Sequence, residues 1–162
     1  MAILNIHSRI LPAAADKVAD IVETFGSGEH DRIWPGAPWP VLALDGPIAI
    51  GTHGSHGGGH YTVVGHQPGR WVRFRFEPGV GEGFHEFTIE PLGDETTKLS
   101  HITVMRLGGP AKLMWPLMIR SLHNDCLESL LDRVERELTG TVRTPHRPDP
   151  YARFLLRMGV MR

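Results

Sequence analysis

Three histidines have a spacing that would bring them to one site. In the run FHEFTIE, His85 alternates with apolar residues along one face of a predicted strand, and His101 does the same in KLSHITVM. If the two strands form a hairpin centred on Gly93, His85 faces His101, whereas a longer loop shifts the register by two and puts His101 opposite Phe87. His123 lies in the middle of the apolar face of a long predicted helix. We therefore expect three imidazoles to converge on one partly apolar space.

Imidazole is the side chain best suited to proton transfer near neutral pH, so His85, His101 and His123 are candidates for general acid–base catalysis. The same residues fit two other interpretations. They could line a pocket and orient a ligand without chemistry, or they could be core histidines bonded to their neighbours. The residue pattern leaves all three open, so it does not decide whether the chain is an enzyme.

Zinc can be held by three histidines and a water, which makes the same trio a candidate metal site. A second candidate is the glycine-rich run GTHGSHGGGH, which contains His53, His56 and His60. On a strand, His53 and His56 would face opposite sides, although flexible glycines could bend them together. The simpler interpretation is a hairpin with solvent-facing histidines, and we expect no metal and no cofactor.

Cys126 follows His123 by three residues, a helical spacing at which a Cys–His nucleophile pair is conceivable. It falls on the apolar face of the helix, where a free cysteine usually acts as a small buried hydrophobe. We therefore interpret Cys126 as part of the core. Asp125, Glu128 and Asp132 fall on the opposite face of the helix, and we expect them to face solvent.

The elements that would position these residues follow one another without repeats. Residues 3–11 alternate as a half-buried strand does, with Leu4, Ile6, Ser8 and Ile10 on one side and Asn5, His7 and Arg9 on the other. Helical spacing predicts a helix over residues 13–25 that stops at Gly26, and a further short helix over 27–34. Six short alternating runs between residues 41 and 105, separated by Gly and Pro turns, predict an antiparallel meander. One long helix is predicted over 112–138, closed by Gly140.

This order of elements resembles the START-like superfamily, and in particular its SRPBCC group of polyketide cyclase/dehydrase-like and lipid-transfer-like proteins. The matching stretches are ILNIHSRILPAAADKVADIV, YTVVGHQPGRWVRFRF, FHEFTIEPLGDETTKLSHITV and LMIRSLHNDCLESLLDRVERE. The resemblance covers residues 1–140. It implies an α+β helix-grip fold, in which a seven-stranded curved antiparallel sheet wraps a long C-terminal helix and two short helices follow the first strand. It also implies a ligand cavity between sheet and helix.

On that fold we expect a cavity wall made of both apolar and polar side chains. The predicted ligand-binding residues are Tyr61, Phe74, Phe76, His85, Phe87, His101, Thr103, Trp115, Ile119, His123 and Leu127. The leading prediction is the binding of a small hydrophobic or aromatic molecule, such as a lipid-like ligand. The resemblance allows two alternatives, because members of the superfamily differ in function. One is a polyketide cyclase/dehydratase-like enzyme that uses a cavity histidine as general acid or base, and the other is a co-chaperone-like interaction module.

Composition excludes several classes of function. The net charge is −1 over 162 residues, so no global field attracts nucleic acid, and we expect no nucleic-acid partner. The single cysteine excludes a disulfide framework within a monomer and suits a reducing cytoplasm, where we expect the protein to act. The N-terminus lacks a signal-peptide pattern, and no apolar stretch approaches the roughly 18 residues of a membrane span.

The C-terminal stretch differs in charge from the rest of the chain. Residues 141–162 contain five Arg and one Asp, a formal charge of +4, which leaves −5 for residues 1–140. The stretch begins rich in proline and ends in the basic, amphipathic run YARFLLRMGVMR. We interpret it as a tail outside the core, able to contact a second copy of the chain or a membrane surface without stable insertion.

Overall fold

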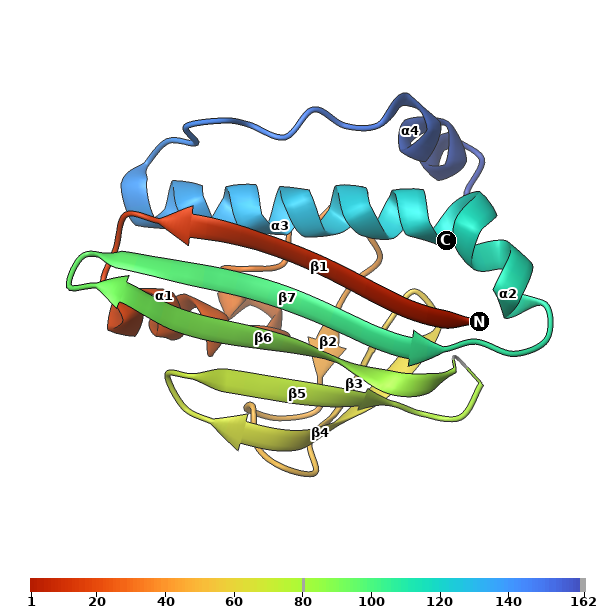
Figure 1. Cartoon of the computed structure of the whole chain (residues 1–162), viewed down its shortest axis with the longest axis horizontal. Coiled ribbons are helices and arrows are strands. Elements are labelled where there is room, and N and C mark those ends of the chain that lie inside the picture. Colours follow the sequence, from red (N-terminus) through yellow and green to blue (C-terminus); the bar gives the residue numbers. More distant parts are fainter. Residues whose placement is uncertain (80, 161–162) are drawn as a thin grey trace.

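A curved sheet holds one long helix against its concave side in the computed structural model, which describes residues 1–79 and 81–160 (Figure 1). The sheet has seven antiparallel strands in the order β1-β7-β6-β5-β4-β3-β2. The strands are β1 (Ala2–Leu11), β2 (Ala43–Leu44), β3 (His53–His56), β4 (Gly59–Gln67), β5 (Trp71–Phe76), β6 (Glu82–Gly93) and β7 (Thr96–Arg106). The predicted seven-stranded helix-grip fold is confirmed, because all six predicted strands of the meander are present and the first strand joins them at one edge.

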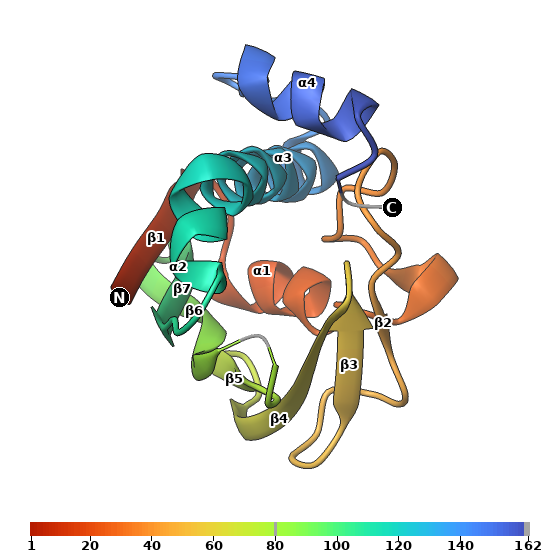
Figure 2. The same ribbon diagram turned by 90° about the vertical axis from the view of Figure 1, so that its right-hand side faces the viewer.

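Two short helices follow the first strand, as predicted. They are α1 (Ala15–Val22) and the 3-10 turn η1 (Gly28–His30). The chain leaves α1 through Gly26, whose φ of 76° is in the left-handed region that favours glycine. Figure 2 shows α1 beneath the long helix, so that the two helices and the sheet enclose the core between them.

The long C-terminal helix is interrupted by one wider turn. It runs through α2 (Ala111–Met114), the π turn η2 (Trp115–Ile119) and α3 (Arg120–Thr139), and ends at Gly140 with a φ of 75°. Pro116 has no backbone N–H to donate to the preceding turn, which accounts for the local change of hydrogen-bonding pattern. The predicted helix over 112–138 is therefore confirmed, with this wider turn near its start.

The register of the β6–β7 hairpin is the alternative shifted by two residues, although the loop itself is short and consists of Asp94 and Glu95. Phe87 lies opposite His101, and His85 lies opposite Thr103, because the register shifts between Pro91 and Gly93. Proline lacks the N–H that a regular ladder needs, so a bulge beside Pro91 is the expected position for such a shift. His85 and His101 are therefore diagonal neighbours on the concave face.

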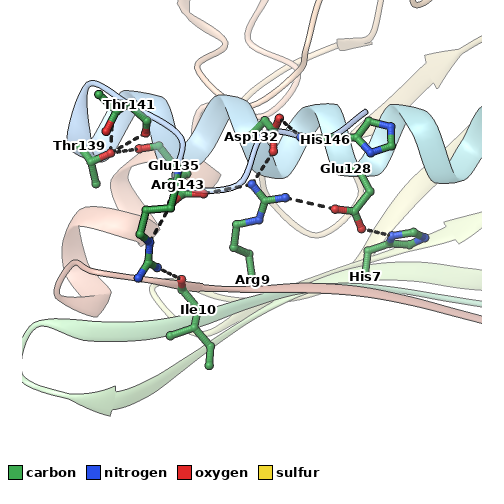
Figure 3. A network of polar contacts seen from close by, with 10 residues as sticks. All are labelled: His7, Arg9, Ile10, Glu128, Asp132, Glu135, Thr139, Thr141, Arg143 and His146. Atoms are coloured by element: carbon green, nitrogen blue, oxygen red, sulfur yellow. Dashed lines mark hydrogen bonds and ion pairs between the residues drawn. The ribbon is translucent and has the colours of Figure 1, made fainter. Parts of the chain in front are cut away.

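The expected burial of the first strand is inverted. The side that carries Leu4, Ile6 and Ile10 faces solvent, with these residues exposed by 67%, 55% and 53%, whereas Ile3 and Leu11 on the other side are buried. The polar side chains instead point toward α3, where His7 and Arg9 contact carboxylates of the helix (Figure 3). Alternation shows only that a strand has two unlike faces. The polar face turns inward here because His7 and Arg9 pair with carboxylates of α3.

The prediction that the acidic residues of the long helix face solvent is wrong for Asp125 and Asp132. Asp125 is 4% exposed and Asp132 is 8% exposed, because Arg9 and the C-terminal stretch cover them. Nε2 of His146 contacts Asp125, and the backbone N–H of His146 donates to Asp132 over 2.8 Å. Glu128 is only partly covered, since it pairs with His7 and Arg9 near the surface.

The C-terminal stretch returns along α3 and ends in a further helix, α4 (Pro150–Arg157), as Figure 1 shows. Ala152 is fully buried and Leu155 is 5% exposed, and both belong to the main core cluster. Asp149 begins α4 by accepting a hydrogen bond from the backbone N–H of Tyr151 over 2.9 Å. These two side chains correct the expectation that the whole stretch lies outside the core.

Candidate functional site

A cavity of about 270 Å³ lies between the concave face of the sheet and the long helix. Its wall is mostly apolar and aromatic, with a few polar groups, as in small-molecule sites generally. The sheet and helix contribute Tyr61, Phe76, His85, Phe87, His101, Thr103, Met105, Trp115, Ile119, Leu122, His123, Cys126, Leu127 and Leu130, and the remaining wall is Phe25, Trp34, Trp39, Pro40, His56 and Gly57, Gly58 and Gly59.

The predicted trio of histidines does meet at this cavity. Nδ1 of His85 lies 3.3 Å from Nε2 of His101, so the two imidazoles share one hydrogen bond. The ring centroids of His101 and His123 are 5.8 Å apart, across the space between sheet and helix. The positions follow from the register, which places His85 and His101 on the same face of neighbouring strands, and from the apolar face of α3, which carries His123.

Several polar atoms in the cavity wall have no hydrogen-bond partner. Among the described residues, five buried side-chain nitrogen or oxygen atoms lack one, and four of these belong to residues that line the cavity. They are Nε2 of His85, Nδ1 of His101, Oγ1 of Thr103 and Nδ1 of His123. A buried polar group without a partner costs about 1–3 kcal/mol, so a cluster of such atoms calls for a bound water, ion or ligand.

The cavity histidines are uncharged at neutral pH. Burial lowers the pKa of His123 to about 3, with further contributions from His7 and His56. Burial also lowers the pKa of His56 to about 4, and it lowers those of His85 and His101 well below the usual value near 6.5. Each ring therefore has one nitrogen that donates and one that accepts.

The β3–β4 hairpin contributes a part of the wall that sequence reasoning missed. Nδ1 of His56 lies 3.4 Å from the hydroxyl of Tyr61, and Gly57 and Gly58 form the turn with φ angles of 55° and 79°. Burial raises the pKa of Tyr61 further above its usual value, so its hydroxyl keeps its proton. Figure 2 shows this hairpin rising toward α3 and closing one side of the molecule.

Trp34 and Trp39 are further members of the wall that sequence reasoning missed. Trp34 directly precedes the proline-rich break PGAPWP and Trp39 lies within it, and this break has neither helical nor strand periodicity. The indole N–H of Trp34 donates to the carbonyl of Pro40 over 3.0 Å, which fixes the loop against the cavity. Large aromatic side chains are usually buried, so two tryptophans in one loop are the signal that could have identified them as part of the wall.

The predicted ligand-binding residues all line the cavity except Phe74. Phe74 lies behind the wall, fully buried, with its ring 5.4 Å from that of Phe25 and stacked on His85 at 4.9 Å. It therefore supports the position of the His85 ring and does not face the open space.

The structure separates two of the three histidines of the glycine-rich candidate metal site. His53 faces outward and contacts Glu77 over 3.0 Å, while His56 faces the cavity, so these two lie on opposite sides of β3 as predicted for a strand. Among the residues that the structure describes, no group of three or more His, Cys, Asp or Glu side chains has an arrangement that could hold a metal ion.

Cys126 lines the cavity as a buried, uncharged thiol. Burial raises the pKa of Cys126 above its usual value, and the neighbouring carboxylate of Asp125 raises it further. The thiolate is the nucleophilic form of cysteine, so this environment disfavours the Cys–His nucleophile considered above.

Comparison with solved structures identifies the architecture. Norcoclaurine synthase from Thalictrum flavum, solved as a point mutant with a transition-state analogue, superimposes with a TM-score of 0.64 at 15% identity over 86% of this chain and 96% of that chain. CalU16 from Micromonospora echinospora gives 0.62 at 15% identity over 98% and 84% of the two chains. The chain has the START-like, helix-grip fold. Because both proteins are only 15% identical to this chain, the similarity establishes the fold that the sequence predicted.

A third START-like neighbour is DynU16, a putative protein in the dynemicin biosynthetic locus, with a TM-score of 0.55 at 23% identity. The similarity covers 86% of this chain and 48% of DynU16, so this chain spans about half of that protein. No family model and no curated protein sequence matches the chain. At these identities the similarity establishes the fold, and the ligand of this START-like chain has to be argued from its own side chains.

Proposed function

We propose that this protein binds a small, uncharged and largely aromatic molecule in the cavity between sheet and long helix. The observation that carries the proposal is the group of four unpartnered polar atoms on His85, His101, Thr103 and His123. A ligand that hydrogen-bonds to these atoms removes their desolvation cost, while an entirely apolar ligand leaves it in place. Norcoclaurine synthase, which shares the fold, was solved in complex with a transition-state analogue, so this fold can hold a small molecule.

The wall restricts the chemistry of the ligand. Because burial keeps the four histidines neutral, the cavity offers no full charge to balance a carboxylate or an amine. Its volume of about 270 Å³ lies just below the roughly 300–1,000 Å³ typical of drug-sized ligands, which favours a molecule of one to three rings over a long-chain lipid. Three tryptophans, Trp34, Trp39 and Trp115, offer flat surfaces for such rings.

The histidine pair sets the pattern of hydrogen bonds. When Nδ1 of His85 donates to His101, Nε2 of His85 accepts and Nδ1 of His101 donates; in the other tautomer the two outer roles exchange. The pair therefore always presents one donor and one acceptor. A ligand with a hydroxyl beside a carbonyl, or with two hydroxyls, matches this pattern, because it also has both.

Two measurements test the binding proposal. Native mass spectrometry of protein purified from its own host should show an adduct of a small neutral molecule. Calorimetric titration with 2-naphthol should show binding that weakens about tenfold in Thr103→Val and in His123→Phe, since each loses one hydrogen bond to the probe. Thr97→Val is the matched control, because Thr97 is fully buried but donates to the carbonyl of Ala13 and lies outside the cavity wall.

The proposal fails if neither an adduct nor 2-naphthol binding is found, or if the cavity variants and Thr97→Val bind 2-naphthol alike.

A reducing intracellular compartment remains part of the proposal, since Cys126 is a free, buried thiol. Among the described residues, none of the helices combines the length and hydropathy that a bilayer span requires.

A second candidate is an acid–base enzyme, favoured by the hydrogen bond between His85 and His101. One outer nitrogen can take a proton from a carbon beside a carbonyl while the other gives a proton to the carbonyl oxygen. The proton between the rings moves from one imidazole to the other, so a ketone becomes an enol and both rings stay neutral. No co-reactant is needed, and the low pKa values of the pair do not hinder a step in which neither ring becomes charged.

Deuterium exchange into 2-tetralone distinguishes the enzyme from the binding protein. An enzyme accelerates exchange at the carbon beside the carbonyl, detected by NMR in D₂O, and loses this acceleration in His85→Phe and His101→Phe. His53→Gln serves as the control, because His53 faces outward and pairs with Glu77. Exchange at the rate of buffer, in a protein that still binds 2-naphthol, would rule out the enzyme and leave the binding proposal intact.

A further inference from the structure

A strip of exposed apolar side chains runs across the start of the long helix and the short helix α4. The strip consists of Leu113, Leu117, Tyr151, Phe154 and Met158, which are exposed by 68%, 60%, 45%, 55% and 68%. The first two lie on the α2–η2 segment and the other three on α4. We call this set the outer strip.

The members of the outer strip adjoin one another. Leu113 and Leu117 are one helical turn apart, and the hydroxyl of Tyr151 donates to the carbonyl of Leu117 over 2.7 Å. The rings of Tyr151 and Phe154 stack with centroids 6.5 Å apart, and Met158 follows Phe154 by one turn. The hydrogen bond therefore joins two segments far apart in the sequence into one continuous surface.

The charged residues within the segments that carry the outer strip are all basic. Residues 111–120 and 150–160 contain four basic residues, Lys112, Arg120, Arg153 and Arg157, and no Asp or Glu. All four basic side chains are exposed. The chain as a whole has a net charge of −1, so this clustering is local. The carboxylate of Asp149 at the start of α4 accepts hydrogen bonds from the hydroxyl of Ser121 and from the backbone N–H of Tyr151.

Part of the outer strip lies on α4, which protrudes from the rest of the molecule. Figures 1 and 2 show α4 as the outermost element above α3. Its inner side chains Ala152 and Leu155 are buried against the body, so α4 is held in place and its other side is turned outward.

From this combination we propose that the outer strip docks the protein on an anionic lipid bilayer. Apolar side chains of a helix that lies in the interface enter the boundary between head groups and acyl chains, while Lys and Arg contact anionic head groups. Aromatic side chains such as Tyr151 and Phe154 suit that depth. A bilayer deforms around projecting side chains, and its anionic head groups supply negative charge to pair with the four basic residues.

The docking surface adjoins the cavity through the α2–η2 segment. Leu113 and Leu117 point outward from this segment, while Trp115 and Ile119 line the cavity. The bilayer would therefore touch the outer side of a stretch whose inner side touches the ligand. The proposal does not depend on the ligand, because it rests on the exposed strip and on the surrounding charges alone.

Sedimentation with vesicles tests the docking. The full chain should bind vesicles of equal parts phosphatidylcholine and phosphatidylglycerol, and should bind pure phosphatidylcholine at least about tenfold more weakly, since each basic residue near an anionic surface contributes roughly a fivefold factor. Arg153→Gln/Arg157→Gln should lower binding to the mixed vesicles about tenfold or more, and Leu117→Ser/Phe154→Ser should abolish it.

Two variants serve as controls. Leu4→Ser/Ile6→Ser removes exposed apolar side chains from β1, and Arg70→Gln/Arg75→Gln removes exposed charges elsewhere. Both should bind as the unaltered chain does. Equal binding to the two vesicle types, no binding, or equal effects of strip and control variants would overturn the proposal. So would a dimer in solution, seen by analytical ultracentrifugation, that Leu117→Ser/Phe154→Ser dissociates, because a second copy would then cover the strip.

Discussion

His85 and His101 share a hydrogen bond of 3.3 Å although their side chains lie diagonally, not directly opposite, on neighbouring strands. Phe87 takes the place opposite His101, with its ring 4.9 Å from the imidazole. The shifted register thus surrounds the shared hydrogen bond with aromatic rings and removes it from water.

Burial of neutral histidines makes stability depend on pH. In the unfolded chain these groups have pKa values near 6.5, but folding lowers that of His123 to about 3 and that of His56 to about 4. The unfolded state therefore binds more protons below pH 6.5, and the free energy of unfolding falls as the pH drops from about 6.5 to about 3. Each such histidine contributes a slope of roughly 1.4 kcal/mol per pH unit.

Urea unfolding of His123→Gln between pH 7 and pH 4 checks this assignment, because glutamine does not titrate. We expect the slope to decrease by about one proton relative to the unaltered chain. His30→Gln, at an exposed position, should leave the slope unchanged. Identical slopes for His123→Gln and the unaltered chain would contradict the assignment.

Two fully buried threonines should respond in opposite ways to the same substitution. Thr103 lines the cavity and its hydroxyl has no partner, so Thr103→Val should be neutral or stabilising by up to about 1 kcal/mol in the absence of ligand. Thr97 donates to the carbonyl of Ala13 over 2.7 Å, so Thr97→Val should destabilise by about 1–2 kcal/mol. Chemical denaturation of the ligand-free protein measures both. Equal losses in the two variants would mean that the Thr103 hydroxyl already has a partner.

Most of the fold was predictable because periodicity and turn residues are local signals. The six strands of the meander, the long helix and its end at Gly140 all follow from patterns within a few residues. The meeting of His85 and His101 followed from the same alternation. The choice between the two registers could not be made, because it depends on a bulge between Pro91 and Gly93 that no pattern fixes.

The remaining differences come from which segment covers which face. The helix pattern separated Asp125 and Asp132 from the apolar face correctly, but it contained no information that Arg9 and the stretch around His146 would cover them. Similarly, Trp34 lies in a loop whose path depends on tertiary contacts. Sequence periodicity shows that a helix or strand has two faces, while burial depends on partners distant in the sequence.

Arg9 should be among the most sensitive positions outside the cavity. Its guanidinium contacts Asp132 over 2.5 Å and Glu135 over 3.1 Å, and the side chain of Glu135 is only 3% exposed (Figure 3). Arg9→Met leaves these carboxylates buried with fewer partners, and we expect a loss of about 3–5 kcal/mol in the free energy of unfolding. Arg32→Met removes an exposed ion pair with Glu137 and should cost about 0–1 kcal/mol.

The contrast between the two arginine variants should shrink in acid, because protonation of the carboxylates removes the charges that Arg9 balances. Denaturation at pH 7 and at pH 3 measures this change. A loss for Arg9→Met that matches that for Arg32→Met at pH 7 would show that water, not Arg9, satisfies the carboxylates.

The last prediction concerns the stretch after residue 140. A chain that ends at Gly140 loses the contacts of His146 with Asp125 and Asp132, and it exposes the surface that Ala152 and Leu155 cover. We expect the free energy of unfolding to fall by at least about 3 kcal/mol, because buried carboxylates then lack partners.

A chain that ends at Val160 keeps all of these contacts and is the control for shortening as such. Asp125→Asn in the Gly140-terminated chain should recover part of the loss, since a neutral amide costs less to leave without a partner than a carboxylate. Thermal and urea unfolding measure the stability of these chains. If the chain ending at Gly140 unfolds like the one ending at Val160, residues 141–160 are an appendage. A large loss that Asp125→Asn reduces would instead make them a structural part of the START-like domain.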